Sequence, residues 1–451
     1  MDRHIEKILL NWKDQSPHLP ILLRGARQVG KSYVIEKFGR EHFADLHTIN
    51  FELQPTLKTC FEDLNPHAIL EKIYISTRRK IEPKKTLLFL DEIQDCPDAI
   101  RSLRYFKELM PELHVIGAGS LLEFVLNDKN FRMPVGRIQS LYLKPLSFKE
   151  FLVGTNNNNL CEIIEKADLT HPVDKIYHDI LLNYLKTYMG LGGMPGVINV
   201  YLATLNTSLG IMSATYDLEQ CRLQQALLLN NYRQDFGKYA KHNQINSIQL
   251  VFEKSPGLVG QHFKYTKVDK DARSYLVKDA LALLKSAGLI QQIYSTAASG
   301  LPLITLMNDK KFKILFLDVG LMIYASQVPM VWYLGDIALL NRGSIAEQFV
   351  GQELQAYSPV YDESSLYFWS RDKKSSMAEV DYLITVDANI IPIEVKAGST
   401  GQLKSLHLFM QEKKSLVGIR ISQQALQYDG KILSIPFYMI NEIPRLVRSL
   451  C

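Results

Sequence analysis

The sequence predicts an α/β fold whose first part is built on a parallel sheet. Short apolar runs alternate there with amphipathic helical patterns, and each run has the length of a buried strand. Buried strands separated by helices are typical of a parallel sheet with both faces covered. The predicted strands are Pro20–Leu23, His47–Phe51, Thr86–Leu90 and His114–Ile116.

A glycine-rich loop follows the first predicted strand. Residues 25–32 read GARQVGKS, which fits the phosphate-binding pattern G-x-x-x-x-G-K-[ST] without a mismatch, and a helical pattern follows. Backbone N–H groups of such a loop cradle phosphates at the positive end of the next helix. Lys31 is expected to bind the β- and γ-phosphates of ATP, and Ser32 to ligate Mg²⁺. The predicted ATP-binding residues of the loop are Gly25, Ala26, Arg27, Gln28, Val29, Gly30, Lys31 and Ser32.

The predicted strand Thr86–Leu90 ends in two acids, Asp91 and Glu92. An acidic strand end downstream of a phosphate-binding loop predicts a P-loop NTPase core. Asp91 would complete the magnesium shell, and Glu92 would polarise the water that attacks the γ-phosphate.

Two further residues of this first part are candidates for the same site. Ser120 ends the apolar run HVIGAGS, where it could sense the γ-phosphate or simply cap the next helix. Arg137 could stabilise transition-state charge, in the same chain or in a neighbouring one. The alternative for Arg137 is a surface arginine without a catalytic role.

The middle of the chain has a different pattern. The alternation of strands and helices stops near Pro145, and the polar tract at 154–160 (GTNNNNL) is typical of a domain edge. From about Asp174 to Gln327 the pattern is mostly helical. Tyr275–Gly288 has a strong helical period and ends on glycine, a common helix stop.

Two short strands, Leu289–Ser295 and Leu301–Met307, are predicted after this helix, and together with it they indicate a winged-helix-like unit. The segment Tyr232–Phe236 is interpreted as structural. Contact of nearby basic residues with a DNA backbone is left open, with solvated surface positions as the alternative; they are Lys264, Lys267 and Lys270.

The last part of the chain predicts a helix from about Gly343, then the strands Leu366–Ser370, Glu379–Val386 and Ile390–Lys396. A turn at Asp387–Asn389 would join the last two strands as a hairpin. Folding about residue 388 brings Asp381 opposite the end that holds Glu394 and Lys396. Because side chains alternate along a strand, these two share one face.

This hairpin predicts a cluster of carboxylates with one ammonium group. Glu347, on the amphipathic segment before it, could supply a further acid. Such a cluster can bind Mg²⁺ or Mn²⁺ through Asp381 and Glu394 and activate water for phosphodiester cleavage, while Lys396 orients the water or stabilises charge. The alternative is a solvated sheet edge. The neighbouring Val380, Ile393 and Val395 favour a face embedded in a sheet.

The basic segment 370–377 could approach a phosphate backbone or form a solvated hairpin tip.

The motifs GARQVGKS, LLFLDE, GAGS, VGR with PLSFKEF, and GGMPGV, followed by YRQDF, FLDVGL, AEQFVGQEL, AEVDYLI and PIEVKAG, resemble one family. It is the prokaryotic AAA-type ATPases that carry the domain of unknown function 4143, and the resemblance covers nearly the whole chain. The resemblance implies an ATPase core, a small helical segment, a winged-helix-like region and a C-terminal fold similar to restriction endonucleases. It implies catalytic roles for Glu347, Asp381, Glu394 and Lys396. The physiological task of that family is largely unassigned.

The predicted domains follow from these patterns. They are an AAA-type P-loop ATPase core at 1–155, a lid-like helical segment at 156–215, a winged-helix-like region at 216–335 and a restriction-endonuclease-like domain at 336–451.

Three functional hypotheses follow. The first is a magnesium-dependent ATPase that couples hydrolysis to DNA transactions through the nuclease-like domain. The second is a regulatory ATPase switch acting on protein interactions, and the third is a nucleic-acid-binding module with a silent nuclease centre. A net charge of +5 is compatible with a polyanionic partner without requiring one. A homo-oligomer is possible.

The composition indicates a folded protein of the cytoplasm. The chain has 451 residues, of which 47% are apolar and 22% charged, as in ordinary folded proteins of several domains. The five cysteines form no C-x-x-C pair, which favours reduced thiols over disulfides or zinc. The N-terminus lacks the apolar core of a signal peptide. Glycines and a proline interrupt the most apolar stretch, Leu181–Leu205, so no membrane span is predicted.

Overall fold

The structure is a computed structural model. It describes residues 1–127, 131, 136–207, 211–270, 273–328, 343–363, 365–373, 376–398 and 403–450.

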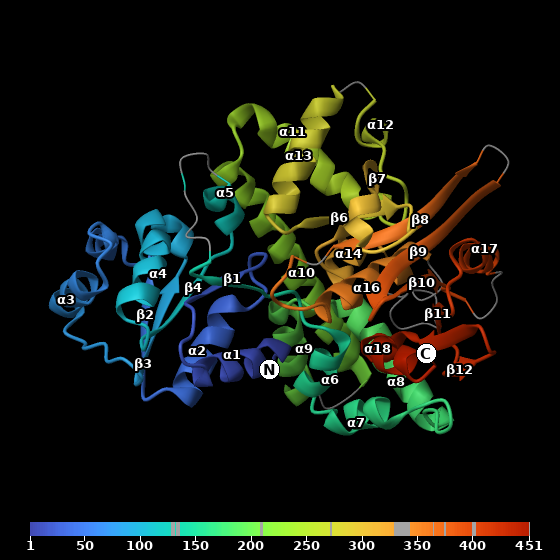
Figure 1. Cartoon of the computed structure of the whole chain (residues 1–451), viewed down its shortest axis with the longest axis horizontal. Helices are drawn as coiled ribbons and strands as arrows, with labels where there is room; N and C mark the ends of the chain where they lie inside the picture. The colour runs from blue at the N-terminus through green and yellow to red at the C-terminus, as the bar shows by residue number, and fades with distance from the viewer. Residues whose placement is uncertain are drawn as a thin grey trace.

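The first part of the chain forms a parallel sheet in the order β2-β3-β4-β1-β5 (Figure 1). This arrangement confirms the parallel sheet and the four strands predicted from the apolar runs. The strand β5 was not among them, since its residues include Gln139 and Ser140 and form no apolar run. The strands are β1 (Ile21–Arg24), β2 (Asp45–Asn50), β3 (Thr86–Asp91), β4 (His114–Ala118) and β5 (Gln139–Tyr142).

Helices cover both faces of this sheet. On one face Leu23 and Phe89 pack with α1 and α2, and on the other Leu22 and Leu88 pack with α3 and α4. Alternate strand residues thus point to opposite cores, as expected for a buried strand. The helices are α1 (His4–Asp14), α2 (Lys31–His42), α3 (Pro66–Thr77), α4 (Pro97–Leu109) and the short α5 (Leu122–Leu126).

The middle of the chain is mainly helical, as predicted. The most apolar stretch is broken at Gly192, which has a φ of 81° and ends α8. The polar tract at 154–160 ends α6 and supplies the first residues of α7. The helices are α6 (Phe148–Gly154), α7 (Asn158–Lys166), α8 (Lys175–Leu191), α9 (Pro195–Thr207), α10 (Ile211–Tyr239), α11 (Ile245–Lys254), α12 (Tyr265–Val268) and α13 (Ser274–Ser286).

A second, eight-stranded sheet has the order β12-β13-β11-β10-β9-β8-β6-β7. Its strands are β6 (Ile290–Thr296), β7 (Met307–Phe316), β8 (Leu366–Lys373), β9 (Ser376–Val386), β10 (Asn389–Val395), β11 (Gly418–Ser422), β12 (Gln427–Tyr428) and β13 (Ile432–Pro436). The helices beside it are α14 (Val319–Ala325), α16 (Gly343–Ala356), α17 (Lys404–Lys413) and α18 (Ile443–Arg448). Because β6 pairs with β8, the segments 216–335 and 336–451 share this sheet.

One predicted strand of this part is wrong. Leu301–Met307 is not a strand, because Leu303–Leu306 forms a short 3-10 helix that starts directly after Pro302. Thr305 donates its backbone N–H to the carbonyl of Pro302 (3.2 Å), which closes the turn. The strand that pairs with β6 begins only at Met307. The other 3-10 helices are Pro55–Phe61, Ile93–Asp95, His242–Gln244, Ser255–Leu258 and Phe437–Glu442.

A buried carboxylate joins three segments that lie far apart in the sequence. Asp318 is fully buried, and its carboxylate accepts hydrogen bonds from the backbone N–H of Gly193 (2.6 Å) and from Gln352 Nε2 (3.3 Å). Leu321 N–H donates to its other oxygen (3.0 Å). The same Gln352 amide donates to the hydroxyl of Tyr188 (3.0 Å). Segments of the sequence motifs GGMPGV, FLDVGL and AEQFVGQEL therefore meet at one place.

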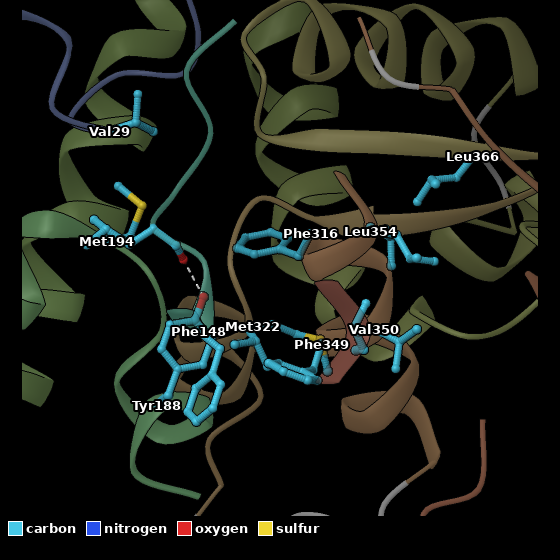
Figure 2. Close-up of a cluster of buried hydrophobic side chains, with 14 of the residues drawn as sticks. Val29, Phe148, Tyr188, Met194, Phe316, Met322, Phe349, Val350, Leu354 and Leu366 are labelled. Carbon is cyan, nitrogen blue, oxygen red and sulfur yellow. Dashed lines mark hydrogen bonds between the residues drawn. The ribbon is translucent and has the colours of Figure 1, made fainter. Parts of the chain in front are cut away.

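Close backbone packing explains two glycines of these motifs, Gly193 and Gly320. A Cβ atom on Gly193 would lie 2.2 Å from the carbonyl oxygen of Leu146, and one on Gly320 would lie 2.3 Å from that of Leu191. Figure 2 shows the apolar packing around this contact. The centre of the Tyr188 ring lies 5.7 Å from that of Phe148 and 6.0 Å from that of Phe349. The core is therefore continuous from the first sheet into α16.

The substitution Gly320→Ala is expected to lower the free energy of unfolding by about 1–3 kcal/mol, because backbone atoms rather than a flexible side chain would have to move. Urea unfolding followed by circular dichroism measures this. Gly257→Ala is the control, since an added Cβ there meets no atom within 4 Å. Equal stability of the two variants would contradict the packing argument.

A second buried acid predicts a pH dependence of stability. Glu353 is fully buried and accepts the backbone N–H of Phe148 (3.0 Å), and burial raises its pKa from 4.5 to about 8. The folded chain therefore holds a proton that the unfolded chain releases above pH 4.5, so this group makes stability fall as pH rises toward 8. The slope is at most about 1.4 kcal/mol per pH unit.

Glu353→Gln removes that proton. The free energy of unfolding of this variant should therefore rise relative to that of the unmodified chain as the pH is raised from 5 to 8. Urea unfolding at three pH values in this range tests the sign. Glu71→Gln, at an exposed position of α3, serves as the control. A difference that stays constant with pH would show that Glu353 does not carry this proton.

Candidate functional site

The phosphate-binding loop has the backbone conformation that its glycines predict. Gly25 and Gly30 have φ angles of 142° and 95°, and Gln28 lies at 66° in the left-handed region. A Cβ on Gly25 would lie 2.3 Å from the carbonyl oxygen of Leu143, so glycine is required there. The helix α2 starts at Lys31, directly after the loop, and its N-terminus points a positive dipole end at the loop.

Lys31 is buried and folds back onto its own loop. Its ammonium donates hydrogen bonds to the carbonyl oxygens of Gly25 (2.9 Å) and Ala26 (2.8 Å). Burial lowers the pKa of Lys31 to about 8, although the charges of Glu92 and Asp91 act in the opposite direction. A triphosphate in the loop would supply the anionic partner that this ammonium lacks.

Ser32 and Asp91 lie together as a magnesium site would need. The Ser32 hydroxyl is 3.0 and 3.1 Å from the two oxygens of Asp91, and Asn50 Nδ2 donates to Asp91 Oδ2 (3.0 Å). A hydroxyl and a carboxylate at this separation are hard oxygen ligands, which suit Mg²⁺. The residues present therefore fit the ion that a bound nucleotide would bring.

Glu92 follows β3 in a strained conformation. Its φ is 47°, in the left-handed region that costs a non-glycine residue free energy and that is common at functional sites. Gln94 donates a hydrogen bond to its carboxylate (2.7 Å), and burial raises the pKa of Glu92. Glu92, Arg27 and Ser120 line one cleft beside the loop. This position suits a base that polarises water next to the γ-phosphate.

The loop is held from outside by α10. Asp235 binds Arg27 Nη1 with both carboxylate oxygens (2.5 and 2.6 Å), and the hydroxyl of Tyr232 donates to the carbonyl of Arg27 (3.0 Å). Arg3 acts similarly from the N-terminal segment, since its guanidinium donates to the carbonyl of Val29 (3.0 Å). The segment Tyr232–Phe236, interpreted as structural, thus contacts the phosphate-binding loop directly.

Arg137 lies away from this loop. It precedes β5, whose first residue Gln139 pairs with Ile21 at the start of β1, whereas the phosphate-binding loop follows the other end of β1. Its guanidinium is exposed and pairs with Glu108 on α4 (3.1 Å). This placement gives no support to a role of Arg137 at its own chain's site. A role at a neighbouring chain's site stays a prediction.

The C-terminal hairpin brings its predicted residues together. The pairing of Asn389 with Val386 continues to Ile393 with Tyr382, so Asp381 lies opposite Glu394. Asp381 accepts the backbone N–H of Val395 (2.8 Å), and Lys396 donates to Glu394 Oε1 (2.6 Å), as expected for side chains on one face. The second oxygen, Glu394 Oε2, is buried without a hydrogen-bond partner in the described part of the chain.

A lysine that the sequence analysis missed lies in this cluster. Lys313 on β7 is 2% exposed, and its ammonium lies 3.4 Å from Glu347 Oε2, 2.5 Å from Glu379 Oε1 and 3.8 Å from Asp381 Oδ1. Glu379 also pairs with His262. Burial alone would lower the pKa of Lys313, but the surrounding carboxylates outweigh it and raise the pKa.

The carboxylates of the cluster respond to burial and to one another. Burial, reinforced by mutual repulsion, raises the pKa of Glu347, Asp381 and Glu394. Burial would also raise the pKa of Glu379, but His262 and Lys313 outweigh it and lower the pKa. The raised pKa values favour the protonated form of these three acids, so the cluster carries less negative charge than four ionised carboxylates would supply.

A divalent metal fits only part of this cluster. Asp381 and the unpaired oxygen of Glu394 are suitable ligands, because both are carboxylates on adjacent antiparallel strands and Glu394 is buried. Across the residues that the structure describes, however, no group of three or more acidic, histidine or cysteine side chains is arranged to hold a metal ion. The predicted third acid, Glu347, contacts Lys313 instead.

The predicted basic residues near α12 lie at the surface. Lys264, Lys267 and Lys270 are all exposed around α12. The segment 370–377 joins β8 to β9, but residues 374–375 and the side chains at 372–377 lie outside the described residues.

Two residues of these sites that were not predicted, Asn50 and Lys313, could have been found from sequence patterns. Asn50 ends the strand beside β3, and carboxyl ends of adjacent parallel strands meet at one edge, so its contact with Asp91 could be predicted. Lys313 stands alone in the apolar run FKILFL, where a charge needs a partner. No local pattern pairs Arg27 with Asp235, because 208 residues separate them.

Family models match three separate parts of the chain. Residues 17–152 match the AAA domain, residues 342–438 match a domain of unknown function (DUF4143), and residues 182–330 match another domain of unknown function (DUF8612). The AAA-type domain with its phosphate-binding loop suggests ATP binding and hydrolysis. The match to DUF4143 confirms that part of the resemblance. No curated protein matches the chain.

Several solved structures share features with the chain. The Walker-type ATPase of Pyrococcus abyssi is 15% identical, covers 72% of this chain and 95% of its own, and has a TM-score of 0.44. The RuvB Holliday junction branch migration motor of Thermotoga maritima is 14% identical, with 64% and 88% covered and a TM-score of 0.29. The AMPPCP-bound DnaA of Aquifex aeolicus is 12% identical, with 62% and 85% covered and a TM-score of 0.28. With TM-scores this low, these likenesses carry no argument on function.

Among the described helices, none combines the length and the apolar composition that crossing a bilayer requires.

Proposed function

We propose that the chain is a magnesium-dependent ATPase whose reaction takes place at the phosphate-binding loop. The observation that carries the proposal is the convergence of Lys31, Ser32, Asp91 and Glu92 at one edge of the first sheet. Lys31 would bind the β- and γ-phosphates, while Ser32 and Asp91 would hold Mg²⁺, which neutralises the phosphate charge. Glu92, oriented by Gln94, would polarise the attacking water.

Lys31→Ala should abolish ATP binding, because the buried ammonium is the positive charge closest to the phosphates. Glu92→Gln should bind ATP normally but turn it over at least about 100-fold more slowly, since an amide cannot accept a proton. Fluorescent-nucleotide binding and phosphate release measure the two effects separately. Arg40→Ala, an exposed position on the same helix α2, is the control. Full hydrolysis by Glu92→Gln would remove this residue from its role.

We further propose that hydrolysis serves a nucleic-acid transaction that involves the C-terminal cluster. Asp381, Glu394 and Lys396 on one hairpin support a site for metal-dependent phosphodiester chemistry. The exposed lysines around α12 support a nearby contact with a phosphate backbone. A metal at Asp381 and Glu394 would supply an activated water. The role of the chain itself would be to hold the two carboxylates, with Lys396 orienting Glu394 through their 2.6 Å contact.

The alternative is a regulatory ATPase in which the C-terminal region binds a partner without cutting nucleic acid. One observation favours it: Lys313 lies among the carboxylates that a catalytic metal would need. In that case ATP turnover would alter the contacts between α16 and the first part of the chain.

Cleavage assays separate the two proposals. Single- and double-stranded DNA and RNA are incubated with Mg²⁺ or Mn²⁺ and ATP, and any cleavage is expected to disappear in Asp381→Ala. The matched control is Asp387→Ala, an exposed acid of the same hairpin that pairs with Arg448. Cleavage that survives Asp381→Ala would contradict the proposed metal site. ATP turnover without cleavage of any substrate would favour the regulatory alternative.

Arg137 is proposed as a contact in trans if the chain forms a homo-oligomer. The surface position of its guanidinium supports this proposal, and its pairing with Glu108 gives it a structural role in the single chain.

A further inference from the structure

Lys313 is the most deeply buried charged group of the C-terminal cluster, and it does not come from the hairpin that carries the predicted site. It lies on β7 at one edge of the sheet, whereas Asp381 and Glu394 lie on β9 and β10. Only 2% of the residue is exposed. A buried ammonium needs anionic partners, because its desolvation is otherwise very costly.

Those partners are the acids around it. The ammonium lies within 4 Å of Glu347, Glu379 and Asp381, and it lies over the ring of Phe368, 5.3 Å from the ring centre. Its distances to Glu347 and Asp381, 3.4 and 3.8 Å, are those of ion pairs. It thus engages one carboxylate from α16 and two from β9 with a single charge.

The backbone fixes the lysine in this place. The neighbouring Phe312 accepts the backbone N–H of Phe263 (2.8 Å), and its ring stacks on that of Phe263. On the other side, Ile293 pairs with Lys313 across the β6–β7 hairpin. While α16 and β9 keep their places, the ammonium can therefore leave the carboxylates by rotation of its own side chain or by movement of β7.

Lys313 leaves the carboxylate of Glu394 without a direct contact and shares that of Asp381 with another donor. Glu394 Oε2 has no hydrogen-bond partner in the described chain, although Glu394 Oε1 binds Lys396. Asp381, directly opposite Glu394, is shared between Lys313 and the backbone N–H of Val395. A divalent cation at Asp381 and Glu394 would therefore lie close to the ammonium of Lys313 and be repelled by it.

We propose that Lys313 is a built-in competitor of divalent metal at the C-terminal carboxylate cluster. While its ammonium lies on Glu347 and Asp381, the cluster binds Mn²⁺ or Mg²⁺ weakly, and a metal binds tightly only when this charge is withdrawn. The inference rests on the proposed metal site at Asp381 and Glu394, and it adds the way in which access to that site is controlled.

Direct Mn²⁺ binding tests this competition without any activity assay. Nucleotide-free full-length protein is titrated with Mn²⁺, and the free ion is measured by electron paramagnetic resonance. Lys313→Met should bind one Mn²⁺ at least about tenfold more tightly than the unmodified chain, because a nearby positive charge is removed. Adding Asp381→Asn to Lys313→Met should abolish the gain, which locates the ion.

Two controls accompany the titration. Lys310→Met removes a lysine at an exposed position of the same strand and should leave Mn²⁺ binding unchanged. Lys313→Arg keeps the charge and should also leave it unchanged. Thermal unfolding gives a second readout, since Mn²⁺ should raise the melting temperature of Lys313→Met and not that of Lys313→Arg.

Equal or weaker Mn²⁺ binding by Lys313→Met would overturn the proposal. If this variant does not fold, Lys313→Gln replaces it, because a neutral amide can still donate to Glu379. A second result would also overturn the proposal: the unmodified chain, with Lys313 in place, binds Mn²⁺ tightly, and Asp381→Asn abolishes this binding. ATP turnover is measured separately, so a failure of the proposed ATPase function is not confused with a failure of this inference.

Discussion

The interaction on which the rest of the structure depends is the buried carboxylate of Asp318. It holds Gly193 from the helical middle, the start of α14, and Gln352 from α16 by hydrogen bonds. A buried carboxylate that lost these partners would cost several kcal/mol, so the three segments must stay together. Gly193 in turn contacts the backbone of Leu146, which follows β5 and the first sheet. The helix α16 is thus tied, through Asp318 and Gly193, to the segment that follows the sheet carrying the phosphate-binding loop.

The helix α16 extends this constraint to the carboxylate cluster. Gln352 contacts Asp318, and Glu353 contacts the backbone of Phe148. One end of the same helix carries Glu347, which contacts Lys313. Residues 347 and 353 are separated by roughly 9 Å along a helix axis. A shift of α16 along its axis would therefore change both sets of contacts at once. This gives a physical route by which events at the first sheet could reach Lys313.

The sequence predicts the local parts of this molecule well and the long-range parts poorly. The phosphate-binding loop and the acidic end of β3 are set by short patterns, because glycine conformation and strand burial are local properties. The hairpin also follows from the alternation of side chains along its strands, although its turn centres between Asp387 and Ala388. Continuing its register by one residue places Asp381 opposite Glu394 itself. Lys313 and the pair of Arg27 with Asp235 depend on segments far apart in the chain. A lone charge in an apolar run signals that a partner exists, and only the fold identifies it.

The buried lysines Lys31 and Lys313 have different charge surroundings at the two sites. Burial dominates at Lys31, whose pKa falls to about 8 while its ammonium donates to two backbone carbonyls. Carboxylates dominate at Lys313, whose pKa is raised. The phosphate-binding loop therefore holds a cation that is hydrogen-bonded to carbonyl oxygens, and an incoming triphosphate would supply a direct anionic partner. The C-terminal cluster already contains a cation, so an incoming metal has to compete with it. The first site favours its ligand by charge, whereas the second opposes its ligand until Lys313 moves.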